Sequence, residues 1–194
     1  MLSQIRPAVV MIALFTGVLG VAYPLAVTGV AQAVFPSQAD GSLVRDEAGR
    51  VIGSALVGQS FAASGYLHPR PSAAGAGYDA AASSGSNLGP LNPDLIARVK
   101  TDADTRRAET GTAVIPADAV TTSASGLDPH ISPAYAKLQA ARIAQARGVA
   151  VEEVSKVIEQ HVEGRTFGVL GQPRVNVLLT NMALDARFVR PAEG

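Results

Sequence analysis

The longest hydrophobic pattern in the chain lies near its N-terminus. No charged residue occurs between Arg6 and Asp40, and residues 8–32 inside this interval are mostly apolar. Because a helix rises about 1.5 Å per residue, such a run is long enough to cross the roughly 30 Å hydrocarbon core of a bilayer. Pro24 should kink this helix without excluding it from a membrane. The pattern predicts one transmembrane helix over residues 8–32.

A cleaved signal peptide is the competing interpretation of the same run. The residues "AQA" at 31–33 match a small-x-small cleavage pattern, but the apolar core of a signal peptide usually covers only about 7–15 residues. The length of the run therefore favours an uncleaved anchor. Arg6 and the amino terminus favour the cytoplasmic side by the positive-inside rule. We expect residues 1–7 inside the cell and a domain of residues 35–194 outside the membrane.

The patterns after the apolar run predict a hairpin and a long loop. Residues 43–61 read as two strands around a turn at 46–49, with the second strand at 51–57. Residues 62–90 are mostly Ala, Gly and Ser, a composition typical of a flexible linker. They also carry two tyrosines and a His-Pro-Arg-Pro string, and long structureless loops are uncommon in compact domains. We expect an ordered, extended loop.

Capping residues and apolar periodicity predict three helices in this domain. An Asn-Pro pair at 92–93 is a typical helix start. A second helix is predicted over 133–147, with Ser132 as its N-cap and Gly148 just past its end. The third is predicted over 151–163. Its apolar face would consist of Val151, Val154, Ile158 and Val162.

The closing segment shows the alternation that is typical of a strand. Val175, Val177 and Leu179 would point to one face of a sheet. Together the elements predict a mixed α/β (α+β) domain with a small sheet and about three helices, preceded by one transmembrane helix.

Composition narrows the classes of partner and cofactor. The chain has 16 basic and 16 acidic residues, so no basic surface is indicated and nucleic acid is not an expected partner. Because cysteine is absent, disulfides, thiolate zinc sites and iron–sulfur clusters are excluded.

The motifs leave several kinds of site open. His68, Asp128 and His130 are conceivable metal ligands, but short ligand pairs such as HxH or HExxH do not occur. The Gly-x-Ser-x-Gly elbow that would carry the serine of a catalytic triad is absent from the sequence. The glycine-rich residues 83–89 lack the lysine of a phosphate-binding loop. A purely structural interpretation is that Asp128, His130 and Ser132 order the turn before a helix, which leaves the chemistry to a partner protein.

Three long strings resemble one known family. They are "YLHPRPSAAGAGYDAAASSGSNLGPLNPDL" at 66–95, "TTSASGLDPHISPAYAKLQAARIAQARG" at 121–148 and "GRTFGVLGQPRVNVLLTNMALD" at 164–185. Together they resemble the C subunit of the bacterial Kdp-type potassium-transporting ATPase. The N-terminal "RPAVVMIALFTGVLGVAYPL" is similar to the single anchor helix of that family.

The resemblance implies a subunit of a four-component pump of the inner membrane. Its partners would be a channel-like potassium-translocating subunit, a P-type ATPase subunit and a small single-span subunit. The C subunit is described as a catalytic chaperone that raises the affinity of the ATPase subunit for ATP, and as required for assembly. ATP and potassium would belong to the complex, with no cofactor bound by this chain alone. Since P-type pumps bind ATP in the cytoplasm, an outer domain could affect ATP only allosterically.

On this interpretation the polar loops become candidates for contacting a partner or for ordering each other. The candidate residues are His68, Arg70, Ser86, Asn87, Asp128, His130 and Gln172. The alternative is a stand-alone, membrane-anchored periplasmic enzyme or ligand-binding protein, which would show activity or ligand binding when purified alone.

Overall fold

The computed structural model describes residues 2–189, and contacts within the chain divide it into the units Met1–Ile52 and Gly53–Gly194. The first unit contains a 3₁₀ turn (Leu2–Gln4), α1 (Ile5–Phe15), a π-helical turn (Thr16–Ala22), α2 (Tyr23–Val34), α3 (Pro36–Ala39), β1 (Leu43–Arg45) and the start of β2 (Val51–Ser54). Strands β1 and β2 pair as the expected hairpin. Strand β2 ends at Ser54 instead of reaching residue 57, because the Ser54 hydroxyl accepts the Leu56 N–H and turns the chain.

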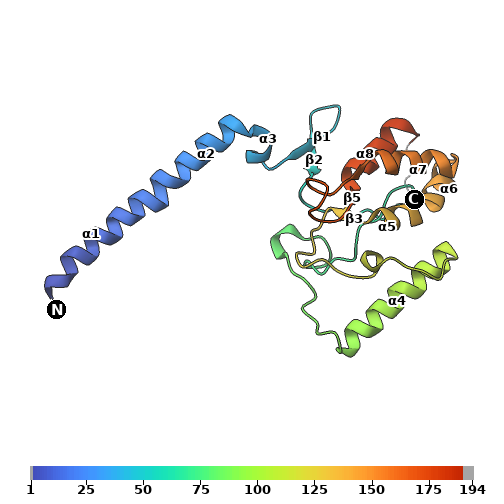
Figure 1. The fold of residues 1–194 in the computed structure, drawn as a ribbon, viewed down its shortest axis with the longest axis horizontal. Helices are drawn as coiled ribbons and strands as arrows, with labels where there is room; N and C mark the ends of the chain where they lie inside the picture. Colours follow the sequence, from blue (N-terminus) through green and yellow to red (C-terminus); the bar gives the residue numbers. More distant parts are fainter. Residues whose placement is uncertain (1, 190–194) are drawn as a thin grey trace. The chain divides into compact units, whose positions relative to one another are not determined.

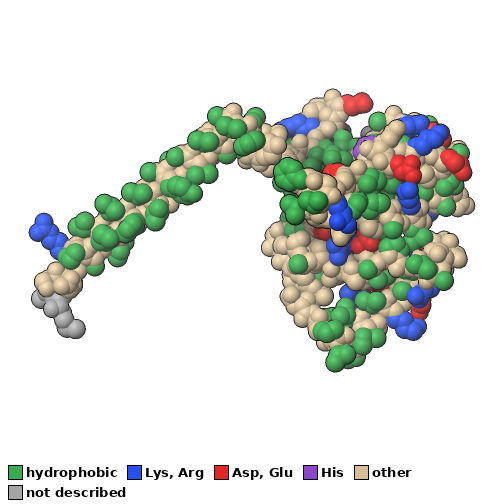
Figure 2. Space-filling model, viewed as in Figure 1, with side chains coloured by type: hydrophobic (Ala, Val, Ile, Leu, Met, Phe, Trp, Pro, Cys, Tyr) green, Lys and Arg blue, Asp and Glu red, His purple; other side chains and the backbone are tan. Residues whose placement is uncertain are grey.

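The predicted apolar helix is present and is slightly longer than residues 8–32. It runs without interruption over Ile5–Val34, with a mean hydropathy of 2.1 and no buried residue in its most apolar window. Figure 1 shows it as one continuous rod from α1 through α2, and Figure 2 shows hydrophobic side chains along its length. By length and composition this helix could cross a membrane.

The helix has a widened turn just before Pro24. Proline has no N–H to donate, and its ring collides with the carbonyl four residues earlier. The helix accommodates it with the π-helical turn Thr16–Ala22, and the Tyr23 N–H bonds to the carbonyl of Val18, five residues back. Such π-helical turns are rare and occur mostly as single-turn insertions inside an α-helix.

The second unit is the mixed α+β domain that the sequence predicts. Its helices are α4 (Pro93–Thr110), α5 (Pro133–Leu138), α6 (Ala140–Arg147), α7 (Val151–Gln160) and α8 (Val177–Arg187), with 3₁₀ turns at Ala80–Ala82 and Ala117–Ala119. Its sheet is antiparallel in the order β3-β5-β4, from β3 (His130–Ile131), β4 (Val162–Glu163) and β5 (Arg174–Asn176). Figure 1 shows α5 to α8 gathered at this sheet.

The prediction of a closing strand through Leu179 is wrong. Strand β5 ends at Asn176, and the side chain of Asn176 accepts the Leu179 N–H as the N-cap of α8. An asparagine cap starts a helix as effectively as serine does. Three alternating residues are also too short a pattern to distinguish a strand from a helix start.

Two smaller boundaries also differ from the prediction. Val162 does not lie on the third helix, because α7 ends at Gln160 and Val162 pairs with Val175 in the sheet. The helix predicted over 133–147 divides into α5 and α6 at Gln139. Both ends of that predicted helix are confirmed, since the Ser132 side chain accepts the Tyr135 N–H and Gly148 is left-handed.

The loop over residues 62–90 is ordered, as predicted. Side-chain amides elsewhere in the domain form hydrogen bonds with part of its backbone. Leu67 is fully buried, and its N–H and C=O both bond to the side chain of Asn181, at 2.7 and 3.1 Å. The N–H and C=O of His68 bond in the same way to Gln139, at 2.8 and 3.0 Å. These amides replace the neighbouring strand that an extended segment would otherwise need.

We expect Asn181→Leu to destabilise the domain by about 2–4 kcal/mol, because it leaves two buried peptide groups of Leu67 without partners. Urea unfolding followed by circular dichroism would measure this loss. Asn92→Ala is the matched control: it removes the single cap bond to Asp94 on the surface and should cost only about 1 kcal/mol. Equal losses in the two variants would contradict the proposed role of Asn181.

Candidate functional site

Arg70 joins the two loops in which the sequence placed most of the candidate residues. Its Nη1 donates to the Oδ2 of Asp128 at 3.0 Å. Its other nitrogens donate to the carbonyl oxygens of Thr121 and Thr122, at 3.3 and 3.2 Å. Tyr78 completes the arrangement by donating its hydroxyl to the Arg70 carbonyl oxygen at 2.7 Å. One guanidinium thus fixes residues more than fifty positions apart in the chain.

Asp128 orders the turn before α5 with its second oxygen. That oxygen accepts the His130 N–H at 3.0 Å and lies 3.5 Å from the His130 ring Nδ1. The backbone on either side continues the network, since Gly58 donates to the Leu127 carbonyl and Val177 to the Pro129 carbonyl. Residues 127–130 therefore connect three separate segments of the fold.

The start of α5 depends on a residue that sequence reasoning missed. Asp118 accepts both the N–H and the hydroxyl of Ser132, at 2.6 and 2.9 Å. The Ser132 hydroxyl in turn accepts the Tyr135 N–H at 3.0 Å. An aspartate fourteen residues before the cap gives no local signal in the sequence.

The two loops approach so closely that only glycine fits at one contact. Gly126 has φ +67°, and a Cβ there would lie 2.7 Å from both the Ala74 nitrogen and the Ser84 oxygen. The Gly126 carbonyl accepts the hydroxyl of Ser72 at 2.6 Å. Any side chain at Gly126 would separate the loops, so the glycine of "SGLDP" serves close packing as well as the turn.

The network shifts the proton affinities of its members. Burial opposes ionisation of Asp128, but hydrogen bonds from His130 and the charge of Arg70 outweigh it and hold the pKa of Asp128 below its usual value. Burial and the nearby Arg142 lower the pKa of His68, which favours the neutral ring. Burial, reinforced by the charge of Asp128, raises the pKa of Tyr78, so its hydroxyl remains a donor.

The structure brings some of the candidate residues together and separates others. Arg70, Asp128 and His130 form the cluster described above, and His68 and Arg70 both line one pocket of about 320 Å³. Ser86 is half-buried and Asn87 exposed, with Asn87 in a left-handed turn at φ +52°. Gln172 lies elsewhere, in the loop between β4 and β5, where it accepts from Arg165 at 2.9 Å.

The ring nitrogen Nε2 of His68 lies 3.2 Å from the Ala63 carbonyl oxygen, and the Nδ1 of His161 lies 2.8 Å from the Val157 carbonyl. Within residues 2–189, no three His, Asp or Glu side chains converge as metal ligands would. The chemistry visible at the cluster is hydrogen bonding and ion pairing that hold the loops in one arrangement.

Comparison with known proteins identifies the family. The family model described as "K+-transporting ATPase, c chain" (KdpC) matches residues 5–186. The chain belongs to this family. Every candidate residue, from His68 to Gln172, falls inside the matched span.

Curated relatives agree with the family match over most of their length. A protein of Caulobacter sp. (strain K31) is 65% identical over 194 residues, covering 100% of this chain and 98% of its own. A Myxococcus xanthus protein is 61% identical over 189 residues, covering 96% and 88%. A Mycobacterium tuberculosis (strain ATCC 25177 / H37Ra) protein is 53% identical over 188 residues, covering 95% and 99%. All three are named "Potassium-transporting ATPase KdpC subunit". This chain is accordingly a subunit of a potassium-transporting ATPase.

We expect Asp128→Asn to lower the stability of the domain by about 1–3 kcal/mol at pH 7, because the Arg70 charge loses its half-buried partner. The folded-state pKa of Asp128 is depressed, so its contribution is present above the unfolded pKa, near 3.8, and is lost as the pH falls through the lower folded value. The difference between wild type and variant should therefore shrink below pH 4.

Thermal unfolding at a series of pH values would measure this difference. Asp104→Asn is the control, since Asp104 forms ion pairs on the exposed face of α4 and should matter less at pH 7. A loss for Asp128→Asn that stays constant from pH 7 to pH 3 would show that the ion pair is not its cause.

Proposed function

We propose that this chain is an accessory, non-catalytic subunit that is needed to assemble a potassium-transporting ATPase and raises the affinity of its P-type subunit for ATP. Its helix over residues 8–32 would anchor it in the inner membrane with residues 1–7 in the cytoplasm. The domain of residues 35–194 would lie outside and contact the channel-like subunit, beside the small single-span subunit. ATP and potassium would be bound by other members of the complex.

The observation that carries this proposal is an exposed apolar tip on the hairpin loop between β4 and β5. Phe167, Val169 and Leu170 are 90%, 70% and 60% exposed. The loop is held in shape by the pairing of Thr166 with Leu170 and by the bond from Arg165 to Gln172. Exposed apolar clusters on a fixed support are typical of protein–protein contacts.

The backbone of this tip supports the same interpretation. Phe167 has φ +53°, a left-handed conformation that is unfavourable for a bulky side chain. In the isolated domain, neither the strained backbone nor the exposed ring of Phe167 contributes to stability. Burial of that ring against another subunit of the ATPase would offset both costs.

An effect on ATP from the outer face requires coupling through the protein. A coupling free energy of about 1–3 kcal/mol changes an affinity roughly 5- to 150-fold. The domain would supply it by binding one conformation of the channel-like subunit more tightly than another, and the ordered loops suit that task because rigid surfaces discriminate between conformations. By reciprocity, ATP binding would tighten the contact made by this chain.

We expect a cysteine at exposed Val114 to react with a membrane-impermeant maleimide on spheroplasts that carry the whole complex. A cysteine in place of Ser3 should react only after the inner membrane is permeabilised. This chain has no native cysteine, so label that is recovered on this chain comes from the one introduced site. Labelling of Val114→Cys only after permeabilisation would place the domain inside and overturn the proposed orientation.

We expect Phe167→Asn to reduce recovery of the other subunits severalfold when the complex is purified through a tag on this chain. Asparagine tolerates φ > 0, so the loop keeps its shape and stability should change by less than about 0.5 kcal/mol. Val114→Ser removes a similarly exposed apolar side chain, 80% exposed, and should leave recovery unchanged. Full recovery with Phe167→Asn, or an equal loss in both variants, would count against the tip as the contact.

A further inference from the structure

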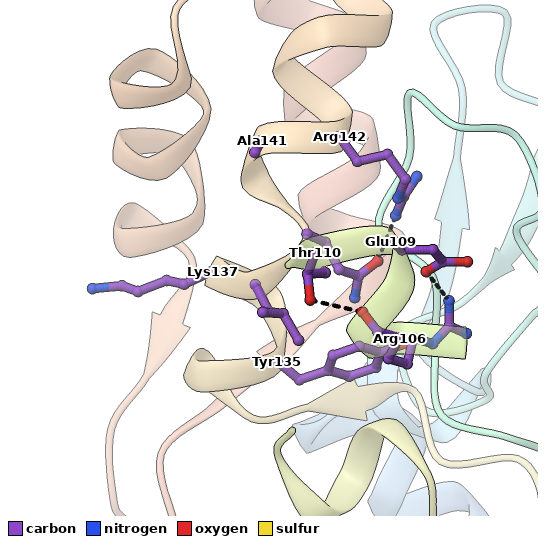
Figure 3. A pocket seen from close by; sticks show the side chains of 9 residues that line it. Arg106, Glu109, Thr110, Tyr135, Lys137, Ala141 and Arg142 are labelled. Carbon is purple, nitrogen blue, oxygen red and sulfur yellow. Dashed lines mark hydrogen bonds and ion pairs between the residues drawn. The ribbon is translucent and has the colours of Figure 1, made fainter. Parts of the chain in front are cut away.

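A second pocket lies between the C-terminal half of α4 and the junction of α5 and α6. Its volume is about 240 Å³. The side chains that line it come from these three helices, and Figure 3 shows how they lie. None of the residues that bond Arg70 or Asp128 lines it, but Arg106 lines both this pocket and the one that His68 and Arg70 share.

One of the side chains that line the pocket, that of Tyr135, has a buried hydroxyl without a partner. Tyr135 is 1% exposed. Among the buried side-chain polar atoms of residues 2–189, its hydroxyl oxygen is the one that lacks a hydrogen-bond partner. Figure 3 shows its ring extending toward Arg106. An unsatisfied buried hydroxyl costs about 1–3 kcal/mol. By contrast the hydroxyl of Tyr78, also in this domain, donates to a carbonyl at 2.7 Å.

The charged side chains of the pocket are more often positive than negative. Two guanidinium groups, those of Arg106 and Arg142, line it beside one carboxylate, that of Glu109. Arg106 bonds Glu109 at 2.8 Å through one nitrogen. Lys137 points away from the others in Figure 3 and pairs with Glu159. Apart from Lys137, the side chains that line the pocket therefore carry one more positive than negative charge, which matches a monoanion better than a dianion.

Arg142 is held in place before any ligand arrives. It donates to the carbonyl oxygens of Ser64 and Tyr66 and, at 2.7 Å, to the side chain of Gln139. Gln139 is itself fixed by both backbone groups of His68. A guanidinium fixed in this way provides a positive charge at a defined place, and guanidinium forks match planar carboxylates.

We infer that this pocket binds a carboxylate, which accepts the Tyr135 hydroxyl and is held by the charges of Arg106 and Arg142. The apolar part of the ligand would lie against Leu138 and Ala141, which also line the pocket. The carboxylate belongs either to a short aliphatic acid or to an acidic side chain of a neighbouring subunit. Both sources present the same group, and they are distinguished by whether the isolated chain responds to a free acid.

The test measures thermal unfolding of the full chain in detergent, with butyrate exchanged for chloride at constant ionic strength and pH 7. We expect butyrate to raise the unfolding midpoint of wild type in a saturable way. Tyr135→Phe should unfold at the same or a higher temperature without butyrate, because it removes an unpaired hydroxyl, and should not respond to butyrate. Tyr78→Phe, the matched control, should be less stable but keep the full response.

The source of the carboxylate is decided by a second measurement. If wild type ignores butyrate but Tyr135→Phe lowers recovery of the assembled ATPase severalfold, the acid is a side chain of another subunit. If Tyr135→Phe changes neither the response of the unfolding midpoint to butyrate nor the recovery of the assembled ATPase, the inference is overturned. It is also overturned if Tyr135→Phe is less stable than wild type without butyrate, because the hydroxyl would then have a permanent partner such as a bound water.

Discussion

The domain depends on hydrogen bonds from side chains to the backbone of one extended segment that has no neighbouring strand. Residues 64–68 run across the helices, and their peptide groups are bonded by side chains instead of by a sheet. Asn181 bonds both the N–H and the C=O of Leu67, and Gln139 bonds both groups of His68. Arg147, whose side chain is fully buried, donates to the Gly65 carbonyl and pairs with Asp185. An unpaired peptide group at these positions would cost as much as a large fraction of the net stability of a domain.

This arrangement explains why the candidate cluster keeps a fixed geometry in loops rich in glycine and serine. The extended segment leads directly into Arg70, which is then tied to Asp128 and to the threonine carbonyls. The loops are therefore ordered by long-range side-chain bonds, and not by their own conformational preference. A loop ordered in this way has lost its entropy on folding, so it can contact a partner without a further ordering cost.

The same distinction separates what the sequence could predict from what it could not. The caps at Asn92 and Ser132 were predictable because a cap and its N–H lie within three residues. The roles of Asn181 and Gln139 were not, since their partners are 114 and 71 positions away. The start of α8 was misread because the cap of Asn176 sits inside an apolar alternation. The exposed tip at Phe167 was also missed, although the glycines on both sides of "VL" in "FGVLG" mark a turn.

Three features stand out against this well-satisfied background. The helix Ile5–Val34 is apolar and unburied, the ring of Phe167 is exposed on a strained backbone, and the hydroxyl of Tyr135 is buried without a partner. Each is unfavourable for the chain alone and becomes favourable in a different environment: lipid, an apolar protein surface and an anionic group. Under the proposed function, the helix would meet lipid as soon as the chain is anchored, and the other two groups would meet their environments in the assembly. Under the proposed function, burial of the Phe167 ring and pairing of the Tyr135 hydroxyl would contribute binding free energy when the complex forms, and this would couple the stability of the chain to that of its partners.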